Sequence, residues 1–343
     1  MGALEAIERL PALAGPILYP CPRCRLEIDL SERSPGEMLS CLGCGSPFEV
    51  PGPETWTPRN PLDETLDDLL GTVVEGIRID RVQAARAGTT IYRGYEIAYG
   101  RPVAVKRFDP SRLADPATLD RLRQEVRLAL GLRHPDLVGI LGLVARGNTQ
   151  LLIMEFVEGT SLDALLEQAG PLPVPRALKI GAALARALAY LHERAIVHRD
   201  VKPGNVFLGL AGEIRLGDLE LLERTDRLSA SPKTAFLVGT PSFMAPELFR
   251  DPSAAGPASD VYSLGATLYQ TLSGELPYYG HDLYDTAHQV LSRDPKPLAS
   301  LRPDLPRGVV LLVECLMARR PQDRPRSPVA EIERLVEALH APP

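Results

Sequence analysis

One segment constrains this chain more than any other: residues 196–208 read I-V-H-R-D-V-K-P-G-N-V-F-L. It places Asp200, Lys202 and Asn205 within six positions, between two stretches of β-type sequence. Such a set suits phosphoryl transfer, because a carboxylate can accept a hydroxyl proton, an ammonium group can neutralise a transferring phosphate and an amide oxygen can hold a metal. The alternative for these residues alone is a salt-bridged loop in which His198 packs as a core residue.

The pattern of apolar residues divides the chain near residue 160. Before it, strand-like stretches at 77–79, 90–97 and 102–108 precede an amphipathic helix at 116–131 and two further strands at 137–144 and 151–156. After it, the periodicity predicts helices at 161–168, 174–194, 258–273, 282–292, 307–317 and 328–339. About sixty residues of loop-like sequence separate the second and third of these helices, and loops of that length are usually functional.

Charge and hydropathy narrow the class of protein. The net charge of −6 and the isoelectric point near 5.6 give no positive field for gripping nucleic acid, so that partner is not expected. The first residues, M-G-A-L-E-A-I-E-R-L-P, lack the basic start and apolar core of a signal peptide, and no apolar stretch is long enough to span a membrane. We therefore expect a cytoplasmic protein without a membrane span.

Four cysteines form one pattern near the N-terminus: C-P-R-C at 21–24 and C-L-G-C at 41–44. Two such pairs at this spacing are typical of a structural Zn²⁺ site, with Cys21, Cys24, Cys41 and Cys44 as the four thiolate ligands. Two disulfides or a redox dithiol are the alternatives, and a reducing compartment argues against disulfides. The fifth cysteine, Cys315, stands in an apolar run and is expected to be buried.

These signals divide the chain into an N-terminal segment (1–18), a zinc-ribbon-like module (19–50), a linker rich in proline and acidic residues (51–72) and a larger domain (73–340). The module is too small for a hydrophobic core of its own, so the metal must hold it together. It is also a candidate surface for binding a partner protein.

From residue 77 to about 340 the chain resembles the eukaryotic-type protein kinases, in the bacterial serine/threonine branch. The segment H-R-D-V-K-P-G-N matches the catalytic loop of that family, and V-A-V-K at 103–106 matches its strand-three lysine motif. Further matches follow in the family order: Glu125 in R-Q-E-V-R-L-A-L, L-R-H-P-D-L-V at 132–138, I-M-E-F-V-E-G at 153–159, G-T-P-S-F-M-A-P-E at 239–247, S-D-V-Y-S-L-G at 259–265, and Arg324.

The resemblance implies an α+β, bilobal kinase fold behind the zinc-ribbon-like module. A small β-rich N-lobe with its αC helix would occupy about 73–156, and a larger helical C-lobe about 157–340. It also implies ATP and Mg²⁺ (or Mn²⁺) as cofactors, and proteins with serine or threonine acceptors as substrates, autophosphorylation included.

The resemblance assigns roles by position. Asp200 would orient and deprotonate the acceptor hydroxyl, Lys202 would stabilise the γ-phosphate, and Asn205 and Asp218 would hold Mg²⁺. The remaining expected roles are the phosphate clamp Lys106 with Glu125, the adenine-binding hinge at Glu155 and Val157 behind Met154, the acceptor-selecting Thr240, the ion pair of Glu247 with Arg324, and the phosphate sensor Arg199, with Thr225, Ser229, Ser231 and Thr234 as activation-loop sites.

Two segments depart from the family pattern. The glycine-rich loop falls on A-A-R-A-G-T-T-I at 84–91, where Ala84, Arg86 and Thr89 replace the motif glycines. The family's D-F-G is D-L-E here, which puts Glu220 in place of a glycine beside the metal site. These departures leave two hypotheses: an active serine/threonine kinase, or a pseudokinase that acts as a binding or scaffolding protein.

Overall fold

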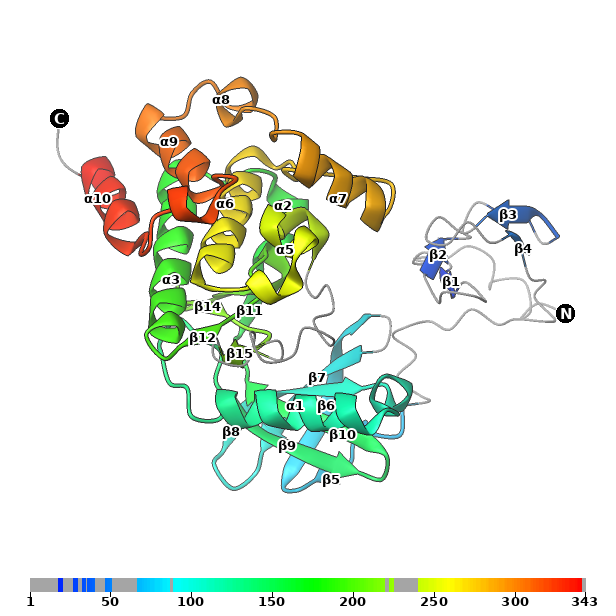
Figure 1. The fold of residues 1–343 in the computed structure, drawn as a ribbon. Helices are drawn as coiled ribbons and strands as arrows, with labels where there is room; N and C mark the ends of the chain where they lie inside the picture. The colour runs from blue at the N-terminus through cyan, green and yellow to red at the C-terminus, as the bar shows by residue number, and fades with distance from the viewer. Residues whose placement is uncertain are drawn as a thin grey trace, which may run out of the picture.

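The computed structural model describes residues 18–20, 27–29, 33–34, 36–40, 47–50, 67–86, 89–219, 222–224 and 240–340. From residue 67 on, the chain forms two lobes. In Figure 1 a twisted sheet with one long helix lies below a larger group of helices. The two-lobed arrangement predicted from the sequence is therefore present, with the strand-rich part first.

The N-lobe is built on one antiparallel sheet of six strands in the order β5-β6-β7-β8-β10-β9. Its strands are β5 (Val73–Val74), β6 (Ile77–Arg86), β7 (Thr89–Glu96), β8 (Arg101–Phe108), β9 (Ile140–Arg146) and β10 (Thr149–Glu155). Successive side chains of a strand point to opposite faces. On β8, Val103 and Val105 are buried in one cluster, whereas Ala104 packs against another. Both faces of the sheet are therefore covered.

Helix α1 (Pro116–Ala129) covers one of these faces and is the αC helix of the resemblance. It begins at Asp115, whose carboxylate accepts a hydrogen bond from the N–H of Thr118. Its apolar stripe, Leu122, Val126 and Ala129, is buried in the cluster that also contains Leu152 of β10. The stripe follows the spacing of three and four that the sequence predicts.

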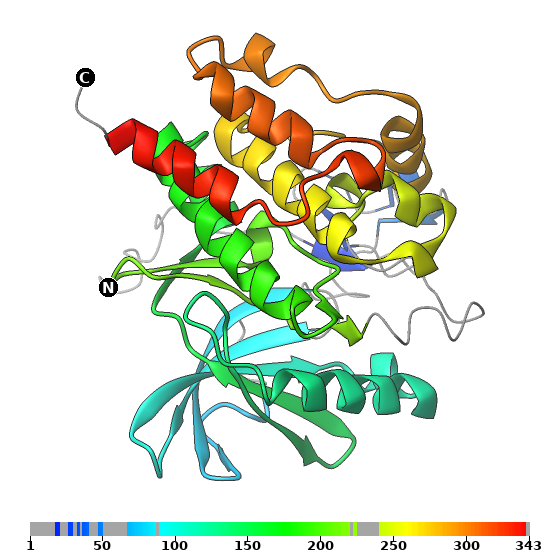
Figure 2. The same cartoon turned by 60° about the vertical axis from the view of Figure 1, so that its left-hand side comes forward.

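The C-lobe packs around two long helices, α3 (Val174–His192) and α6 (Pro257–Ser273), which lie side by side in Figure 2. Most of α6 is buried, because α3 and α9 (Arg307–Leu316) both pack against it. The remaining helices are α2 (Leu162–Ala169), α5 (Pro246–Arg250), α7 (Leu283–Ser292), α8 (Leu298–Leu301) and α10 (Val329–His340). The central pair gives the catalytic segment a rigid support.

The long loop-like stretch contains short strands. Strands β11 (Gly159–Ser161), β13 (Val206–Gly209) and β14 (Ile214–Leu216) form a three-stranded sheet, and β12 (Ile196–Val197) pairs with β15 (Glu223–Arg224). The catalytic segment 198–205 therefore lies between β12 and β13. The β12–β15 pair also places the chain that follows Asp218 beside the entry to that segment.

The N-terminal region contains two short antiparallel hairpins. Strand β1 (Leu18–Pro20) pairs with β2 (Glu27–Asp29), and β3 (Met38–Ser40) pairs with β4 (Pro47–Glu49). In the sequence, the C-P-R-C pair stands between β1 and β2, and the C-L-G-C pair between β3 and β4. The four cysteines themselves lie outside the described residues, as does the linker up to residue 66.

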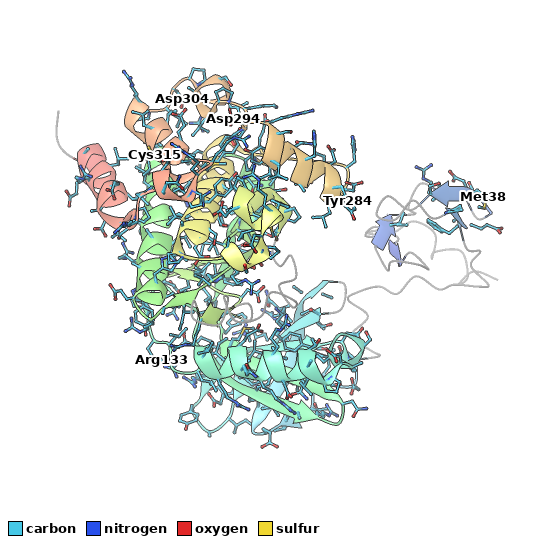
Figure 3. All side chains as sticks on the ribbon, in the orientation of Figure 1. Met38, Arg133, Tyr284, Asp294, Asp304 and Cys315 are labelled. Atoms are coloured by element: carbon cyan, nitrogen blue, oxygen red, sulfur yellow. The ribbon has the colours of Figure 1, made fainter. Side chains whose placement is uncertain are left out.

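The prediction that Cys315 is buried was wrong. Leu312, Val313 and Leu316 form the buried stripe of α9, but Cys315, labelled on α9 in Figure 3, lies beside that stripe and is exposed. An apolar run on a helix does not imply that every member faces the core. Within the described part of the chain, no helix combines the length and apolarity that crossing a membrane requires.

Candidate active site

A cleft of about 560 Å³ lies between the lobes. The N-lobe strands contribute side chains from one face, and the C-lobe contributes the segment around Asn205 and the start of the next loop. Its lining includes Ile91, Ala104, Lys106, Met154, Phe207 and Asp218. Apolar walls with a few charged groups at one end are typical of a small-molecule site.

The catalytic segment is attached to α6 by one buried carboxylate, that of Asp260, which is 1% exposed. Its Oδ2 accepts from the N–H of His198 at 2.8 Å and its Oδ1 from the N–H of Arg199 at 2.9 Å. The ring Nε2 of His192 lies 2.8 Å from the same Oδ2. These bonds hold Arg199 at φ +71°, in the left-handed region, where a residue other than glycine needs support.

The ring of His198 adds a second connection. The N–H of Asp200 donates to His198 Nδ1 at 3.3 Å, so the ring proton is on Nε2, which bonds to the carbonyl oxygen of Gly217 at 3.0 Å. His198 is fully buried and joins the segment of Asp200 to that of Asp218. It therefore has a core position and a structural role beside the site.

Asp200 is the centre of a compact polar network. Lys202 Nζ lies 2.7 Å from Asp200 Oδ2, and Asn205 Nδ2 donates to the same oxygen at 2.9 Å and to the Asp200 carbonyl at 2.8 Å. Lys202 Nζ also donates to Thr240 Oγ1 at 2.7 Å, and Thr240 Oγ1 donates to Asp200 Oδ1 at 3.3 Å. The structure thus brings together the four residues that the sequence assigned to acceptor recognition and catalysis.

Asp218 and Lys106 meet across the cleft, with Lys106 Nζ 3.0 Å from Asp218 Oδ1. Burial acts to raise the pKa of Asp218, but the charge and hydrogen bond of Lys106, together with the charge of Lys202, hold that pKa below its ordinary value. Asp218 has φ +57°, a conformation that needs support from its surroundings. Glu125 is half-buried on α1, between Leu122 and Val126 of the apolar stripe.

The hinge residue Glu155 is fixed by three contacts. Its N–H donates to the Gly139 carbonyl at 2.8 Å, its Oε2 accepts from the Gly139 N–H at 3.1 Å, and Arg215 Nη1 of β14 lies 2.6 Å from that oxygen. Glu155, Val157 and Met154 all line the cleft. The Glu155–Arg215 ion pair, which sequence reasoning missed, joins the hinge to the C-lobe.

The two strands that flank the tip of the glycine-poor loop, β6 and β7, pair up to the last described residue on either side. Arg86 pairs with Thr89 in register, and Ala84 pairs with Ile91. Ala84 and Thr89 line the cleft, so the facing ends of β6 and β7 border the site. The side chain of Arg86, residue Glu220 and the activation-loop residues Thr225, Ser229, Ser231 and Thr234 lie outside the described part of the structure.

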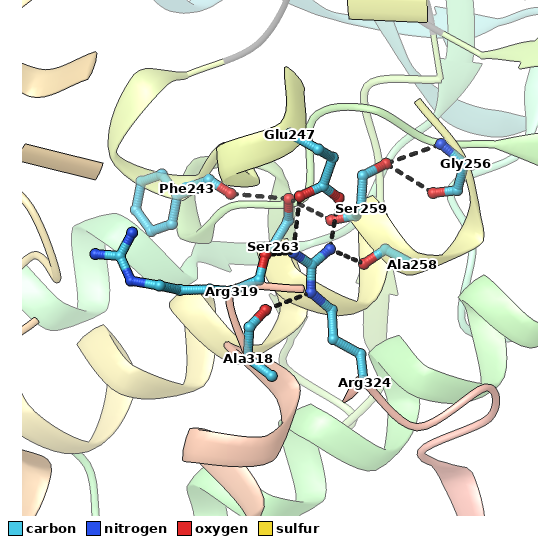
Figure 4. Close-up of polar contacts among 9 residues, drawn as sticks. All are labelled: Phe243, Glu247, Gly256, Ala258, Ser259, Ser263, Ala318, Arg319 and Arg324. Carbon is cyan, nitrogen blue, oxygen red and sulfur yellow. Dashed lines mark hydrogen bonds and ion pairs between the residues drawn. The ribbon is translucent and has the colours of Figure 1, made fainter. Parts of the chain in front are cut away.

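Arg324 and Glu247 form a two-pronged ion pair within the C-lobe, with Nη1–Oε1 at 2.6 Å and Nη2–Oε2 at 2.7 Å (Figure 4). The same guanidinium donates to the carbonyl oxygens of Ala318 and Ala258. Only 4% of Arg324 is exposed. This pair joins the first turn of α5 to the segment between α9 and α10.

Two further functional residues were not assigned from the sequence, Asp260 and His192. Asp260 stands in the S-D-V-Y-S-L-G motif, and its isolation in an otherwise uncharged helix was the available signal. A lone charge in an apolar helix of a soluble domain needs a buried partner. His192 gave no such signal. It is the last residue of α3, and histidine is common at the C-terminal end of a helix for reasons unrelated to a site.

Comparisons with known proteins agree with this geometry. The protein kinase domain family matches residues 87–336. The chain is 32% identical over 282 residues to the serine/threonine-protein kinase PknL of Mycobacterium tuberculosis H37Rv, covering 81% of this chain and 70% of that protein. It is 33% identical over 284 residues to PknA of the same strain, covering 80% and 64%. It is 34% identical over 262 residues to pkn2 of Myxococcus xanthus, covering 73% and 31%.

A solved structure shows the same fold. The kinase domain of M. tuberculosis PknI superposes with a TM-score of 0.64 at 25% sequence identity, covering 78% of this chain and 97% of that one. The chain therefore belongs to the protein kinase family, in its serine/threonine class. The pseudokinase alternative receives no support from these comparisons.

Proposed function

We propose that this chain transfers the γ-phosphate of ATP to serine or threonine hydroxyls of proteins, itself included. One observation carries the proposal: Asp200, Lys202, Asn205 and Thr240 are bonded to one another at a cleft whose other charged pair is Lys106 with Asp218. Most of the catalysis of phosphoryl transfer comes from placing such charges, and all of them are present. The replaced loop glycines change the rim of the cleft, not this set.

In this proposal Asp200 receives the acceptor hydroxyl. Its Oδ1 takes a hydrogen bond from Thr240 at 3.3 Å, a contact that an incoming serine or threonine hydroxyl can replace. Lys202 Nζ already bridges Asp200 and Thr240, so it is placed to neutralise charge on the phosphate that moves past it. The hinge at Glu155 and Val157 borders the apolar end of the cleft, where adenine would lie.

The donor set fits Mg²⁺. Asn205 uses its amide nitrogen on Asp200, so its amide oxygen is the atom available to a cation. Asp218 gives Oδ1 to Lys106 and has a second carboxylate oxygen. Among the described residues, no group of three or more histidine, cysteine or acidic side chains is arranged to hold a metal. Mg²⁺ suits such a site, because it takes few protein ligands and completes its shell with phosphate oxygens and water.

The N-terminal region adds a second proposal, a structural Zn²⁺ held by Cys21, Cys24, Cys41 and Cys44. Each cysteine pair stands in the connection of an antiparallel hairpin, β1–β2 or β3–β4, and this is where two knuckles can face one metal. The strands described here are only three residues long, too short to hold a module without a metal. The resulting surface would serve to bind a partner protein.

Kinase activity is tested on the full chain. The melting temperature is measured with and without Mg-ATP, and phosphate transfer is then followed to the chain itself and to a generic basic protein. We expect a stabilising shift and transfer to serine or threonine. Absence of both would refute the proposal. Transfer that survives Asp200→Asn would identify a contaminating kinase as the source.

Zinc is tested by metal analysis of the purified chain, for which we expect one equivalent. Cys24→Ser should lose it, whereas Cys315→Ser, on the exposed face of α9, should keep it. Full metal content in Cys24→Ser would refute the site.

A further inference from the structure

The last residues before the first N-lobe strand lie on the sheet face opposite to α1. Leu69 is 1% exposed and belongs to a cluster with Tyr92 of β7, Val105 of β8 and Leu151 of β10. The N–H of Gly71 donates to the Ile79 carbonyl at 2.9 Å, which begins the pairing of the chain with β6. We call residues 67–72 the strap.

Polar contacts fix the strap at its other end. Tyr92 donates its hydroxyl to Asp67 Oδ2 at 2.5 Å, and Arg107 Nη1 of β8 donates to Asp68 Oδ1 at 2.8 Å. Arg146 Nη1 of β9 donates to the Asp68 carbonyl at 3.2 Å. Strands β7, β8 and β9 thus all contact a turn of two aspartates and one buried leucine.

The strap contacts β7 and β8 on the sheet face opposite to the cleft, next to the residues that line the cleft. Tyr92 follows Ile91, and Arg107 follows Lys106, and both Ile91 and Lys106 line the nucleotide cleft. Because successive residues of a strand face opposite sides of the sheet, the strap and the nucleotide would touch the same two strands from opposite faces. A shift of either strand would therefore alter both its contacts with the strap and its contacts with the nucleotide.

We propose that the strap is a docking element whose contacts with the back of the sheet set the affinity of the cleft for nucleotide. Docking of Asp67 and Asp68 holds β7 and β8 in the positions at which Ile91 and Lys106 face the cleft. When the strap lifts, the two strands are released and nucleotide binding weakens. The inference rests on the nucleotide-binding part of the proposed function.

The chemistry of these contacts allows the strap to leave the sheet and dock on it again. Burial and the hydrogen bond to Asp67 raise the pKa of Tyr92 to about 12, so the phenol remains a donor at neutral pH. Asp68 and Arg107 meet at the surface, where the Asp68 side chain is 64% exposed, and only Leu69 is deeply buried. One apolar anchor with charged flanks can separate from the sheet without unfolding the lobe.

Conservative variants of the full chain separate this role from a purely structural one. Asp67→Asn and Tyr92→Phe each weaken the contact between the strap and the sheet while they preserve side-chain volume. The matched control is Asp80→Asn, which removes a surface ion pair with Arg78 on β6. For each, the dissociation constant of Mg-ATP is measured by calorimetry, the melting temperature is recorded, and kcat and KM are determined for ATP and for the basic protein.

We expect Asp67→Asn and Tyr92→Phe to raise the dissociation constant and KM for ATP by about three- to tenfold, the range found for packed coupling networks. The double variant should do no more than Asp67→Asn alone, because Tyr92→Phe removes only the hydrogen bond to Asp67, whereas Asp67→Asn also weakens the ion pair with Arg107. At saturating ATP, kcat and the KM for protein substrate should stay within about twofold of wild type. Asp80→Asn should match wild type throughout.

Two results would overturn the inference. If Asp67→Asn and Tyr92→Phe lowered the melting temperature but bound ATP as tightly as Asp80→Asn does, the strap would be a stabilising element only. Equal losses in kcat and in both KM values would point to general damage of the lobe. If the wild-type chain bound no Mg-ATP, the proposed function would fail and the role of the strap with it, so the two failures are told apart.

Discussion

The ring of Phe207 lies so close to Gly217 that a β-carbon at residue 217 would stand 2.7 Å from the Phe207 Cε2 atom. Val138 Cγ2 would be 3.2 Å from the same β-carbon, so the space is closed on two sides. Phe207 lines the cleft, and Gly217 immediately precedes Asp218. The residue before Asp218 is therefore small because the floor of the cleft occupies its side-chain space.

Gly217→Ala should consequently disturb both packing and binding. We expect a loss of about 1–3 kcal/mol in the free energy of unfolding and weaker ATP binding, because the ring must move into the cleft. Adding Phe207→Leu should recover much of both losses. Denaturant unfolding and calorimetry provide the measurements. Gly142→Ala on β9, where a β-carbon meets nothing within 4 Å, is the control, and equal behaviour of the two alanine variants would contradict the steric explanation.

The Arg324–Glu247 pair should contribute strongly to stability. Arg324→Met would leave the half-buried Glu247 carboxylate without its partner and would remove the donor to three backbone carbonyls. We expect a loss of about 3–5 kcal/mol in unfolding free energy. Arg320→Met, which breaks an exposed pair with Asp323, should cost less than about 1 kcal/mol. Urea denaturation of the two variants side by side would reveal an error if their losses were similar.

Asp260 should give the C-lobe an acid-sensitive contribution to stability. Burial acts to raise its pKa, but the hydrogen bond and charge of His192 and the hydrogen bond from the His198 backbone N–H bring that pKa below the ordinary value of 3.8. A lowered pKa in the folded state stabilises the fold above the unfolded value, and the contribution is lost as the pH falls through the folded value.

Asp260→Asn should therefore be less stable than wild type by about 3 kcal/mol above pH 5, with a gap that narrows as the pH falls below 4. Unfolding curves between pH 3 and 7 measure this gap. Asp294→Asn, whose side chain is 84% exposed, should show a small and flat difference. A gap for Asp260→Asn that widens in acid would reverse the sign that we derive.

Lys106 should control activity more than stability. Lys106→Met removes the cation that Asp218 faces at 3.0 Å and, in the proposed function, the clamp on the nucleotide phosphates. We expect phosphate transfer to fall by about 10²–10³-fold, the usual effect of losing one electrostatic contact in a transition state. Lys179→Met, on the exposed face of α3, serves as the control. Retention of at least half the wild-type rate by Lys106→Met would contradict the role.

The sequence predicted the helices of the fold well and its short strands poorly. The helices expected at 174–194, 258–273 and 307–317 differ from α3, α6 and α9 by at most two residues at either end, because each carries several turns of apolar period. Strands β12 and β15 have two residues each, and two residues show no alternation. They exist because the partner strand, far along the chain, supplies the hydrogen bonds.

The candidate site divides in the same way. Asp200, Lys202 and Asn205 were found because they stand together in the sequence. The anchor of their segment, Asp260, is 62 positions from His198, and Arg215 is 60 positions from Glu155. The packing of α6 and β14 brings such partners together, and no local sequence pattern reveals that packing. Only the family motif around Arg324 revealed a distant pair beforehand.

The hydrogen bonds that attach residues 198 and 199 to α6 should also slow hydrogen exchange in the catalytic segment. Their two amide protons belong to an irregular loop beside an open cleft, where rapid exchange with solvent would be ordinary. Both are held by Asp260, a carboxylate on the most deeply buried helix of the lobe, so releasing them requires that helix to move. We expect these two protons to exchange as slowly as those of α6 itself, so that the catalytic segment keeps its shape for as long as the whole lobe stays folded.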